Sequence, residues 1–320
     1  MTSQQRLGII GCGAVVQMNY LPALAYYPDV HLARVNDLDT EAAAHVAALS
    51  GAVASSQEQI MADCDIVIVA TPPGTHRGLV EKFLADGRTV ICEKPFVGRK
   101  ADAEYLAELA TERNSRLFVA HFRRCIPSVQ LGRALIESGI LGQVTGVSAY
   151  EGGRFAWQSK SSYVYKDPHG GVLFDTGSHT LDMLLYVAGL DTGGLEVTDA
   201  RTERDCPEPS NELEARVSFR RESRDIPGHF KLSRVGATAN KIRVECENGF
   251  IELPVGLANY VRMGRGDGPA VIVYARESYS DLMDCFALQL KQMFSRDDDD
   301  TFAADRFINL TGLLESVNDA

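Results

Sequence analysis

The sequence lacks the features that mark a secreted, zinc-binding or membrane protein. Its seven cysteines are scattered and form no Cys-x-x-Cys pair, which argues against a disulfide framework or a zinc site and favours reduced thiols. No apolar run reaches membrane-spanning length, and the start, MTSQQRLGIIGCG, has no charged-then-apolar signal region. We therefore expect a cytoplasmic protein with no membrane partner.

Positive charge is also scarce. Acidic residues outnumber Lys and Arg by 43 to 32, and no basic patch is visible, which excludes nucleic acid as a partner. The acidic run SRDDDDT (295–301) is interpreted as a solvated loop. The HExxH metal motif, the GxSxG nucleophile elbow and a YxxxK dyad are absent as well, and we expect no metal.

What is present fits two globular domains in 320 residues. Residues 1–122 alternate strand and helix signals, and CDIVIVATPP (64–73) is a continuous β-branched run, typical of a parallel sheet covered by helices on both faces. This alternation predicts a doubly wound α/β domain with right-handed crossovers.

Residues 123–320 change in character. Alternating segments dominate, and NKIRVECENGFIEL (240–253) contains an ENG hairpin signal. The pattern predicts an α+β domain with an open, mostly antiparallel sheet. Helical patterns at 280–294 and 302–317 close the chain. We expect the last helix either to stay with this second domain or to pack back on the first.

A glycine-rich turn follows the first strand signal, in GIIGCGAVV (8–16). In this context glycines let the backbone approach a pyrophosphate at a helix N-terminus. The candidate cofactor contacts are Gly11, Gly13, Ala14 and Val15. The third position of the usual motif is Val16, a departure that could loosen the packing of helix on strand. A glycine turn without a cofactor is the alternative.

An acidic residue, Asp37, ends the second strand signal, 24 residues after Gly13. An acid at this place hydrogen-bonds both ribose hydroxyls and repels a 2′-phosphate. Its followers Leu38 and Asp39 offer no positive charge. We therefore expect NAD rather than NADP.

Two further segments stand at the carboxyl edge of the expected parallel sheet, where ligands bind such folds. In ATPPGTH (70–76), Thr71, Pro72 and His76 are candidates for the nicotinamide side, and His76 is equally well interpreted as a helix-start residue without a ligand. In CEKP (92–95), Glu93 and Lys94 are candidate cofactor contacts, and a strand-end lysine can shift its pKa when desolvated.

Residues 172–188 predict a largely buried helix, because they include no Lys, Arg or Glu. Asp175, His179, Asp182 and Tyr186 would form one polar seam within about 60° of arc. Buried Asp and His need partners or a ligand. The seam is thus either a buried His–Asp pair that only stabilises the fold or a functional site.

In this order and spacing, GIIGCG, ATPPGTH, EKP and GGVLFDTGSHTLD resemble the glucose–fructose oxidoreductase, inositol dehydrogenase and MocA family over essentially the whole chain. The resemblance implies an NAD(P)-binding Rossmann domain and a C-terminal domain whose open sheet forms a homo-oligomer, a dimer or tetramer. It implies hydride transfer at a hydroxyl or ketone of a sugar, inositol or related polyol. By motif position, the catalytic residues would be Lys94, Asp175 and His179.

From these roles we expect His179 to act as general acid or base and Lys94 to stabilise the reacting oxygen. Asp175 would orient His179 or bind a neighbouring hydroxyl, and Asp182 is expected to be structural. AHFRR (120–124) departs from the family pattern but keeps Arg123. The candidate substrate contacts are Arg123, Tyr150, Arg154, Trp157 and Tyr163.

Two other functions stay open. One is an enzyme that uses tightly bound NAD transiently, in redox-assisted glycoside cleavage or epimerisation. The other is a non-catalytic NAD-binding regulator.

Overall fold

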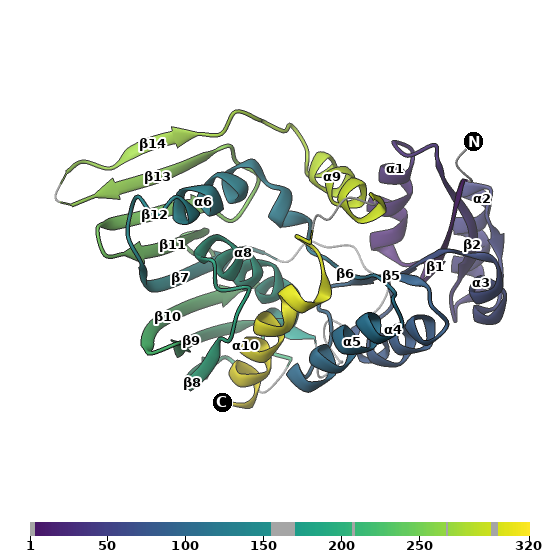
Figure 1. Cartoon of the computed structure of the whole chain (residues 1–320), viewed down its shortest axis with the longest axis horizontal. Coiled ribbons are helices and arrows are strands. Elements are labelled where there is room, and N and C mark those ends of the chain that lie inside the picture. Colours follow the sequence, from purple (N-terminus) through teal and green to yellow (C-terminus); the bar gives the residue numbers. More distant parts are fainter. Residues whose placement is uncertain (1–3, 155–169, 207–208, 267, 296–299) are drawn as a thin grey trace. The chain divides into compact units, whose positions relative to one another are not determined.

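The computed structural model describes residues 4–154, 170–206, 209–266, 268–295 and 300–320. The chain divides into two compact units (Figure 1). Of the described residues, unit 1 comprises 4–120, 286–295 and 300–305. Unit 2 comprises the described residues from 121 to 285 and residues 306–320. The division after residue 120 lies close to the expected boundary at 122, but residues 286–295 and 300–305 group with unit 1.

Unit 1 is built on a parallel sheet. Its strands are β1 (Gln5–Ile10), β2 (Val30–Asn36), β3 (Val53–Ala54), β4 (Ile66–Val69), β5 (Thr89–Glu93) and β6 (Leu117–Ala120). They pair in the order β3-β2-β1-β4-β5-β6, and every described pair is parallel. This is the doubly wound order of dinucleotide-binding folds, with its switch point between β1 and β4. The predicted Rossmann architecture is confirmed.

The helices of unit 1 begin and end where local chemistry dictates. They are α1 (Leu21–Leu24), α2 (Thr40–Ser50), α3 (Gln57–Asp63), α4 (His76–Ala85) and α5 (Lys100–Glu112). Asp39 caps α2 by accepting two backbone N–H bonds, and Gly51 ends it in a left-handed conformation. A π-helical turn, η1 (Val16–Tyr20), precedes α1, and Val16 is fully buried. The wider turn thus begins at the position where Val replaces the usual small residue.

Unit 2 is built on an eight-stranded sheet ordered β14-β13-β12-β11-β7-β10-β9-β8. Its strands are β7 (Val144–Gly152), β8 (Glu196–Arg204), β9 (Glu212–Arg221), β10 (Arg224–Ser233), β11 (Lys241–Cys246), β12 (Gly249–Pro254), β13 (Tyr260–Arg265) and β14 (Val271–Tyr274). Only β7 and β10 pair in parallel among these described strands. The expectation of a mostly antiparallel sheet is confirmed.

Helices cover one face of this second sheet, as Figure 1 shows. They are α6 (Pro127–Glu137), α8 (Ser178–Ala188) and α10 (Ile308–Asp319), with short turns η3 (Phe122–Cys125), η4 (Leu173–Gly177) and η5 (Ala304–Phe307). The strands alternate buried and exposed side chains, as in β9, because their buried face packs on the helices. Within the described residues, no helix combines the length and the apolar character needed to cross a membrane.

The last helix, α10, belongs to unit 2, where it packs on β8 and α8. The segment that groups with unit 1 is the one before it, which includes α9 (Leu282–Phe294) from Phe286 onward. The ring of Phe286 meets Tyr20 edge-on at 5.3 Å, and Tyr27 meets Phe294 at 5.7 Å. These aromatic contacts explain why this segment, rather than the last helix, returns to the first unit.

Candidate functional site

The glycine turn after β1 contains two glycines, Gly11 and Gly13, whose surroundings differ. Gly11 has a φ of +94°, and a Cβ there would lie 2.4 Å from the carbonyl oxygen of Ala70, at the end of β4. The fold itself therefore requires glycine at this position. Gly13 is exposed, and a Cβ there would meet no protein atom within 4 Å. That open space at the start of a helix fits the close approach of a pyrophosphate.

Asp37 lies directly against this turn. Its carboxylate accepts hydrogen bonds from the N–H of Cys12 at 2.6 Å and of Asp39 at 2.8 Å. Burial, together with the charge of Asp37, raises the pKa of the Cys12 thiol to about 12, so the thiol stays protonated. Leu38 is 98% exposed beside it. This arrangement fits a ribose diol, and the two residues that follow Asp37, Leu38 and Asp39, carry no positive charge for a 2′-phosphate.

The segments after β4 and β5 are joined by a buried histidine. His76 is fully buried, with Nδ1 2.9 Å from the carbonyl oxygen of Pro95 and Nε2 2.8 Å from that of Thr71. Backbone thus encloses the ring, in keeping with the structural alternative. Thr71 stays half-buried and Pro72 exposed.

Glu93 and Lys94 differ in exposure although they are neighbours. The Glu93 carboxylate is buried and accepts from the Tyr20 hydroxyl at 2.7 Å and from the Lys94 N–H at 3.1 Å. Burial raises the pKa of Glu93. The Lys94 side chain is half-exposed, as a group that meets a ligand must be. Tyr20, fully buried on η1, was not foreseen as the partner of Glu93.

In unit 2, the polar seam of the predicted helix divides into two halves. Asp175, Thr176 and His179 are half-exposed, whereas every other residue from 171 to 188 is buried. Arg234, 3% exposed, donates to Asp175 Oδ2 from Nη2 at 2.7 Å. Arg234 directly follows β10 and ends the alternating segment HFKLSR (229–234). This position was the sequence feature that could have pointed to Arg234 as a site residue.

His179 lies among aromatic rings contributed by η3 and the residue before it. The ring of Phe122 meets it at 5.4 Å and that of His121 at 5.8 Å, both edge-on. His121 is fully buried, and its Nδ1 lies 3.5 Å from Asp182 Oδ2. The ring orientation of His179 is thus defined by packing within its own unit.

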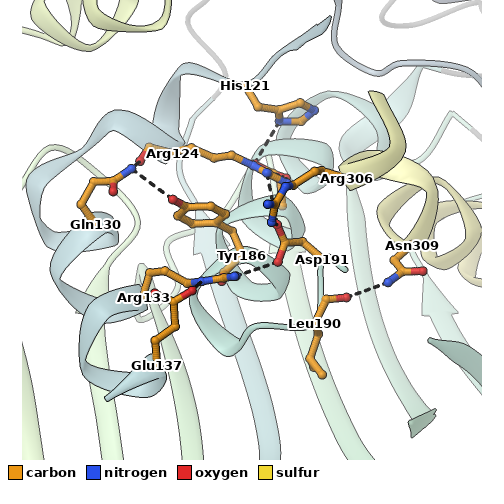
Figure 2. A network of polar contacts seen from close by, with 11 residues as sticks. His121, Arg124, Gln130, Arg133, Glu137, Tyr186, Leu190, Asp191, Arg306 and Asn309 are labelled. Atoms are coloured by element: carbon orange, nitrogen blue, oxygen red, sulfur yellow. Dashed lines mark hydrogen bonds and ion pairs between the residues drawn. The ribbon is translucent and has the colours of Figure 1, made fainter. Parts of the chain in front are cut away.

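Asp182 is ion-paired with Arg124 in a buried ionic network. Figure 2 shows Arg124 in this network together with Asp191 and Arg133. Arg124 and Asp182 are both fully buried, and Arg124 contacts both carboxylate oxygens at 2.7 to 3.1 Å. Arg124 also reaches Asp191, which in turn accepts from Arg133 at 2.7 Å. The guanidinium of Arg124 stacks on Phe307 at 4.1 Å. The network joins η3, α6, α8 and η5, and this placement agrees with a structural role for Asp182.

The candidate substrate contacts that the structure describes have different surroundings. Arg123 forms a two-pronged ion pair with Glu151 at 2.8 and 3.0 Å, and Arg154 is exposed. The hydroxyl of Tyr150 bonds His229 at 3.0 Å, and strand alternation puts it on the sheet face opposite the buried Ala149, which α8 covers. Trp157 and Tyr163 lie outside the described residues.

Across the described part of the chain, no group of three or more His, Cys, Asp or Glu is placed to hold a metal ion.

The fold and the glycine turn together define a dinucleotide-binding protein with a second, sheet-based domain. The chain belongs to the GFO/IDH/MocA oxidoreductase family. The family profile described as "Oxidoreductase family, NAD-binding Rossmann fold" matches residues 5–121, and the GFO/IDH/MocA C-terminal domain matches residues 129–252. The NAD expectation is therefore borne out at the level of the family.

Similar proteins agree with this membership. An uncharacterized oxidoreductase of Schizosaccharomyces pombe is 33% identical over 43% of the chain, and inositol 2-dehydrogenase of Rhizobium meliloti is 28% identical over 61%. The matches span 38% and 58% of those two proteins. The solved structure of GenD2 from gentamicin A biosynthesis, in complex with NAD, superposes with a TM-score of 0.81 at 19% identity, covering 100% of this chain and 95% of that one.

Alanine substitutions at the two glycines of the turn are expected to have different effects, one on stability and the other on NAD affinity. Gly11→Ala meets Ala70 and a positive φ, so we expect it to lower the free energy of unfolding by more than about 1 kcal/mol. Gly13→Ala meets no protein atom, so we expect the thermal midpoint to hold while affinity for NAD falls. Thermal unfolding and NAD titration of both variants check this. A Gly13→Ala protein that binds NAD like the wild type would contradict our interpretation of the turn.

Removing one partner of the buried ion pair predicts a large loss of stability. Arg124→Met leaves the Asp182 carboxylate buried without its cation, which costs about 3–5 kcal/mol. Urea unfolding should show this loss, and Arg124→Met combined with Asp182→Leu should recover part of it. Arg113→Met, at an exposed arginine, is the control. Equal stability of Arg124→Met and wild type would show that the pair is not needed.

Proposed function

We propose that the protein is an NAD-dependent oxidoreductase that acts on a secondary hydroxyl or ketone of a sugar, inositol or related cyclic polyol. The observation that supports this proposal most is the exposure of Asp175 and His179. Both are half-exposed, whereas every other residue from 171 to 188 except Thr176 is buried. A purely structural His–Asp pair would be expected to be buried with the rest of the seam. Family membership and the glycine turn support the cofactor.

The cofactor-binding residues we propose belong to unit 1. They are Gly11, Gly13, Ala14, Val15, Asp37, Thr71, Pro72, Glu93 and Lys94. Asp37 is held in place by two backbone N–H groups, so its orientation is set before a ribose binds. Bound NAD would supply the hydride acceptor, or NADH the donor.

His179 is the proposed general acid or base. Its Nδ1 is buried, which leaves Nε2 to take the hydroxyl proton during oxidation and to return it during reduction. Asp175 is held by the nearly buried Arg234, so its carboxylate keeps one orientation in which it accepts a hydrogen bond from a neighbouring hydroxyl. Lys94 would donate to the reacting oxygen and stabilise negative charge that develops there.

The polyol class rests on similarity and on charge. Inositol 2-dehydrogenase is among the similar proteins. Two of the arginines that contact this helix are ion-paired: Arg123 with Glu151 and Arg234 with Asp175. Paired charges present both donors and acceptors, which suits the hydroxyls of a neutral polyol.

An activity screen with matched variants tests the proposal. We expect NADH to form when inositols, aldoses or glycosides are supplied with NAD, and to be consumed with keto-sugars, with weaker activity on NADP. His179→Gln should lower kcat by about 10²–10⁴-fold and Lys94→Ala by about 10²–10³-fold, because each removes a proton-transfer or charge-stabilising group.

His45→Gln, an exposed histidine on α2, is the control and should keep full activity. Full activity of Lys94→Ala or His179→Gln would overturn the mechanism. Turnover of a glycoside or epimer without net NADH would favour transient use of NAD. Binding of NAD without any turnover would favour a regulator.

We also propose a homo-oligomer, a dimer or tetramer, formed through the sheet face of unit 2 opposite its helices. That face carries ordered charge pairs, among them Lys241 and Glu252 at 2.6 Å and His229 and Glu214 at 2.7 Å. Ion pairs that are already formed on this face favour a polar interface between two subunits of the same chain. The cytoplasm stays a prediction from the sequence.

Sedimentation velocity tests the assembly. The wild-type chain should sediment as a dimer or larger. Arg262→Glu, next to Glu252 at 3.6 Å, should weaken association by like-charge repulsion. Arg113→Glu, exposed on unit 1, should leave the mass unchanged. A monomeric wild type would rule the interface out.

A further inference from the structure

A pair of charged side chains contacts α8 next to His179. Arg123 donates to Glu151 Oε2 from Nη1 at 2.8 Å and to Oε1 from Nη2 at 3.0 Å. The Thr180 hydroxyl donates to the same Oε2. Arg123 Nη1 also lies 4.0 Å from the sulfur of Met183. Thr180 directly follows His179, and Met183 stands one turn after it, so the pair packs on the stretch of α8 that carries His179.

Part of this pair is open to solvent. The side chains of Arg123 and Glu151 are 18% and 17% exposed. Phe122, the neighbour of Arg123 on η3, places its ring 5.4 Å from that of His179, which is half-exposed. All these residues belong to unit 2. A ligand that reaches His179 can therefore also reach the charges of Arg123 and Glu151.

The accessible charges beside His179 are unequal. In the other ion pair near this residue, Asp175 is 19% exposed, whereas Arg234 is only 3% exposed. The two pairs together thus present two carboxylates and one guanidinium to a ligand. Arg123 is that guanidinium, and Glu151 engages two of its N–H groups. The charges of these two pairs at the surface therefore disfavour an anion.

Glu151 has room for one more hydrogen bond. A carboxylate has about four lone-pair sites on its two oxygens. Arg123 and Thr180 occupy two on Oε2, and Arg123 occupies one on Oε1. A hydroxyl of a neutral polyol can donate to the remaining site on Oε1. An ionised carboxylate has no proton to donate and carries the same charge as Glu151, so it is repelled there.

Resting on the proposed polyol oxidoreductase function, we infer that Glu151 sets the charge specificity of the site: it accepts neutral sugars and polyols and rejects sugars that carry a carboxylate, such as uronates. A guanidinium matches a carboxylate through two parallel hydrogen bonds, so Arg123 is the group that would attract an acidic sugar. Glu151 already engages this fork. A group that repels the wrong ligand is a general means of specificity.

Binding of matched sugars tests the inference. Calorimetry compares D-glucose with D-glucuronate and D-galactose with D-galacturonate, with and without NADH. Glu151→Gln should bind a uronate about 10–100-fold more tightly than the wild type, the gain expected when charge-assisted hydrogen bonds to Arg123 become possible. This gain should fall as salt is raised. The neutral sugars should change less, since the Gln amide oxygen still accepts from a hydroxyl.

Two further variants control for charge and for the binding group. Asp86→Asn makes the same charge change in unit 1, where Asp86 pairs with Arg88 at 2.9 Å just before β5, and it should leave every affinity unchanged. Glu151→Gln combined with Arg123→Gln should lose the gained uronate affinity. Glu151→Ala replaces Glu151→Gln if the latter fails to fold.

The inference is overturned by a wild type that binds a uronate as tightly as its neutral counterpart, by an absent gain in Glu151→Gln, or by a gain that persists without Arg123. Turnover separates it from the proposed function. If the wild type turns over uronates with NAD in preference to neutral sugars, the inference fails and the oxidoreductase proposal stands. The expected gain in a protein that turns over no sugar would support the charge specificity while the proposed reaction fails.

Discussion

The ion pair between Arg124 and Asp182 is the interaction on which the second unit depends. Both side chains are fully buried, so neither charge can be solvated if the other moves away. Asp182 lies on α8 three residues after His179, and Arg124 lies on η3 two residues after Phe122, which packs on the His179 ring. One pair therefore fixes the helix and its aromatic surroundings together.

Buried and half-exposed polar groups have separate tasks in both units. In unit 2 a π-helical turn, η4, precedes α8, and Asp175 and His179 reach the surface while Asp182 is enclosed. In unit 1 the half-exposed Lys94 follows the buried Glu93, whose carboxylate is fixed by Tyr20. In both places the enclosed group makes the scaffold rigid and its exposed neighbour is available for chemistry.

Sequence periodicity was sufficient to predict the alternating strands and helices of unit 1, because buried strands such as β4 are continuous apolar runs. It was not sufficient for β8, which lies at the sheet edge, has half-exposed or exposed side chains throughout and shows no apolar alternation. The side chains that contact the site residues could not be predicted from the sequence either. Arg234 lies 59 positions from Asp175, and Tyr20 lies 73 from Glu93, so only the folded chain brings them together.

The distribution of cysteines has a practical result for protein chemistry. Six of the seven are buried, and Cys206 alone is of intermediate exposure. Burial keeps Cys12, Cys64, Cys246 and Cys285 protonated at neutral pH, since it raises the pKa of each thiol to about 11 or 12. Because alkylating reagents attack the thiolate at accessible sulfur, the native chain should take up a probe at one defined position, Cys206, far along the sequence from the glycine turn.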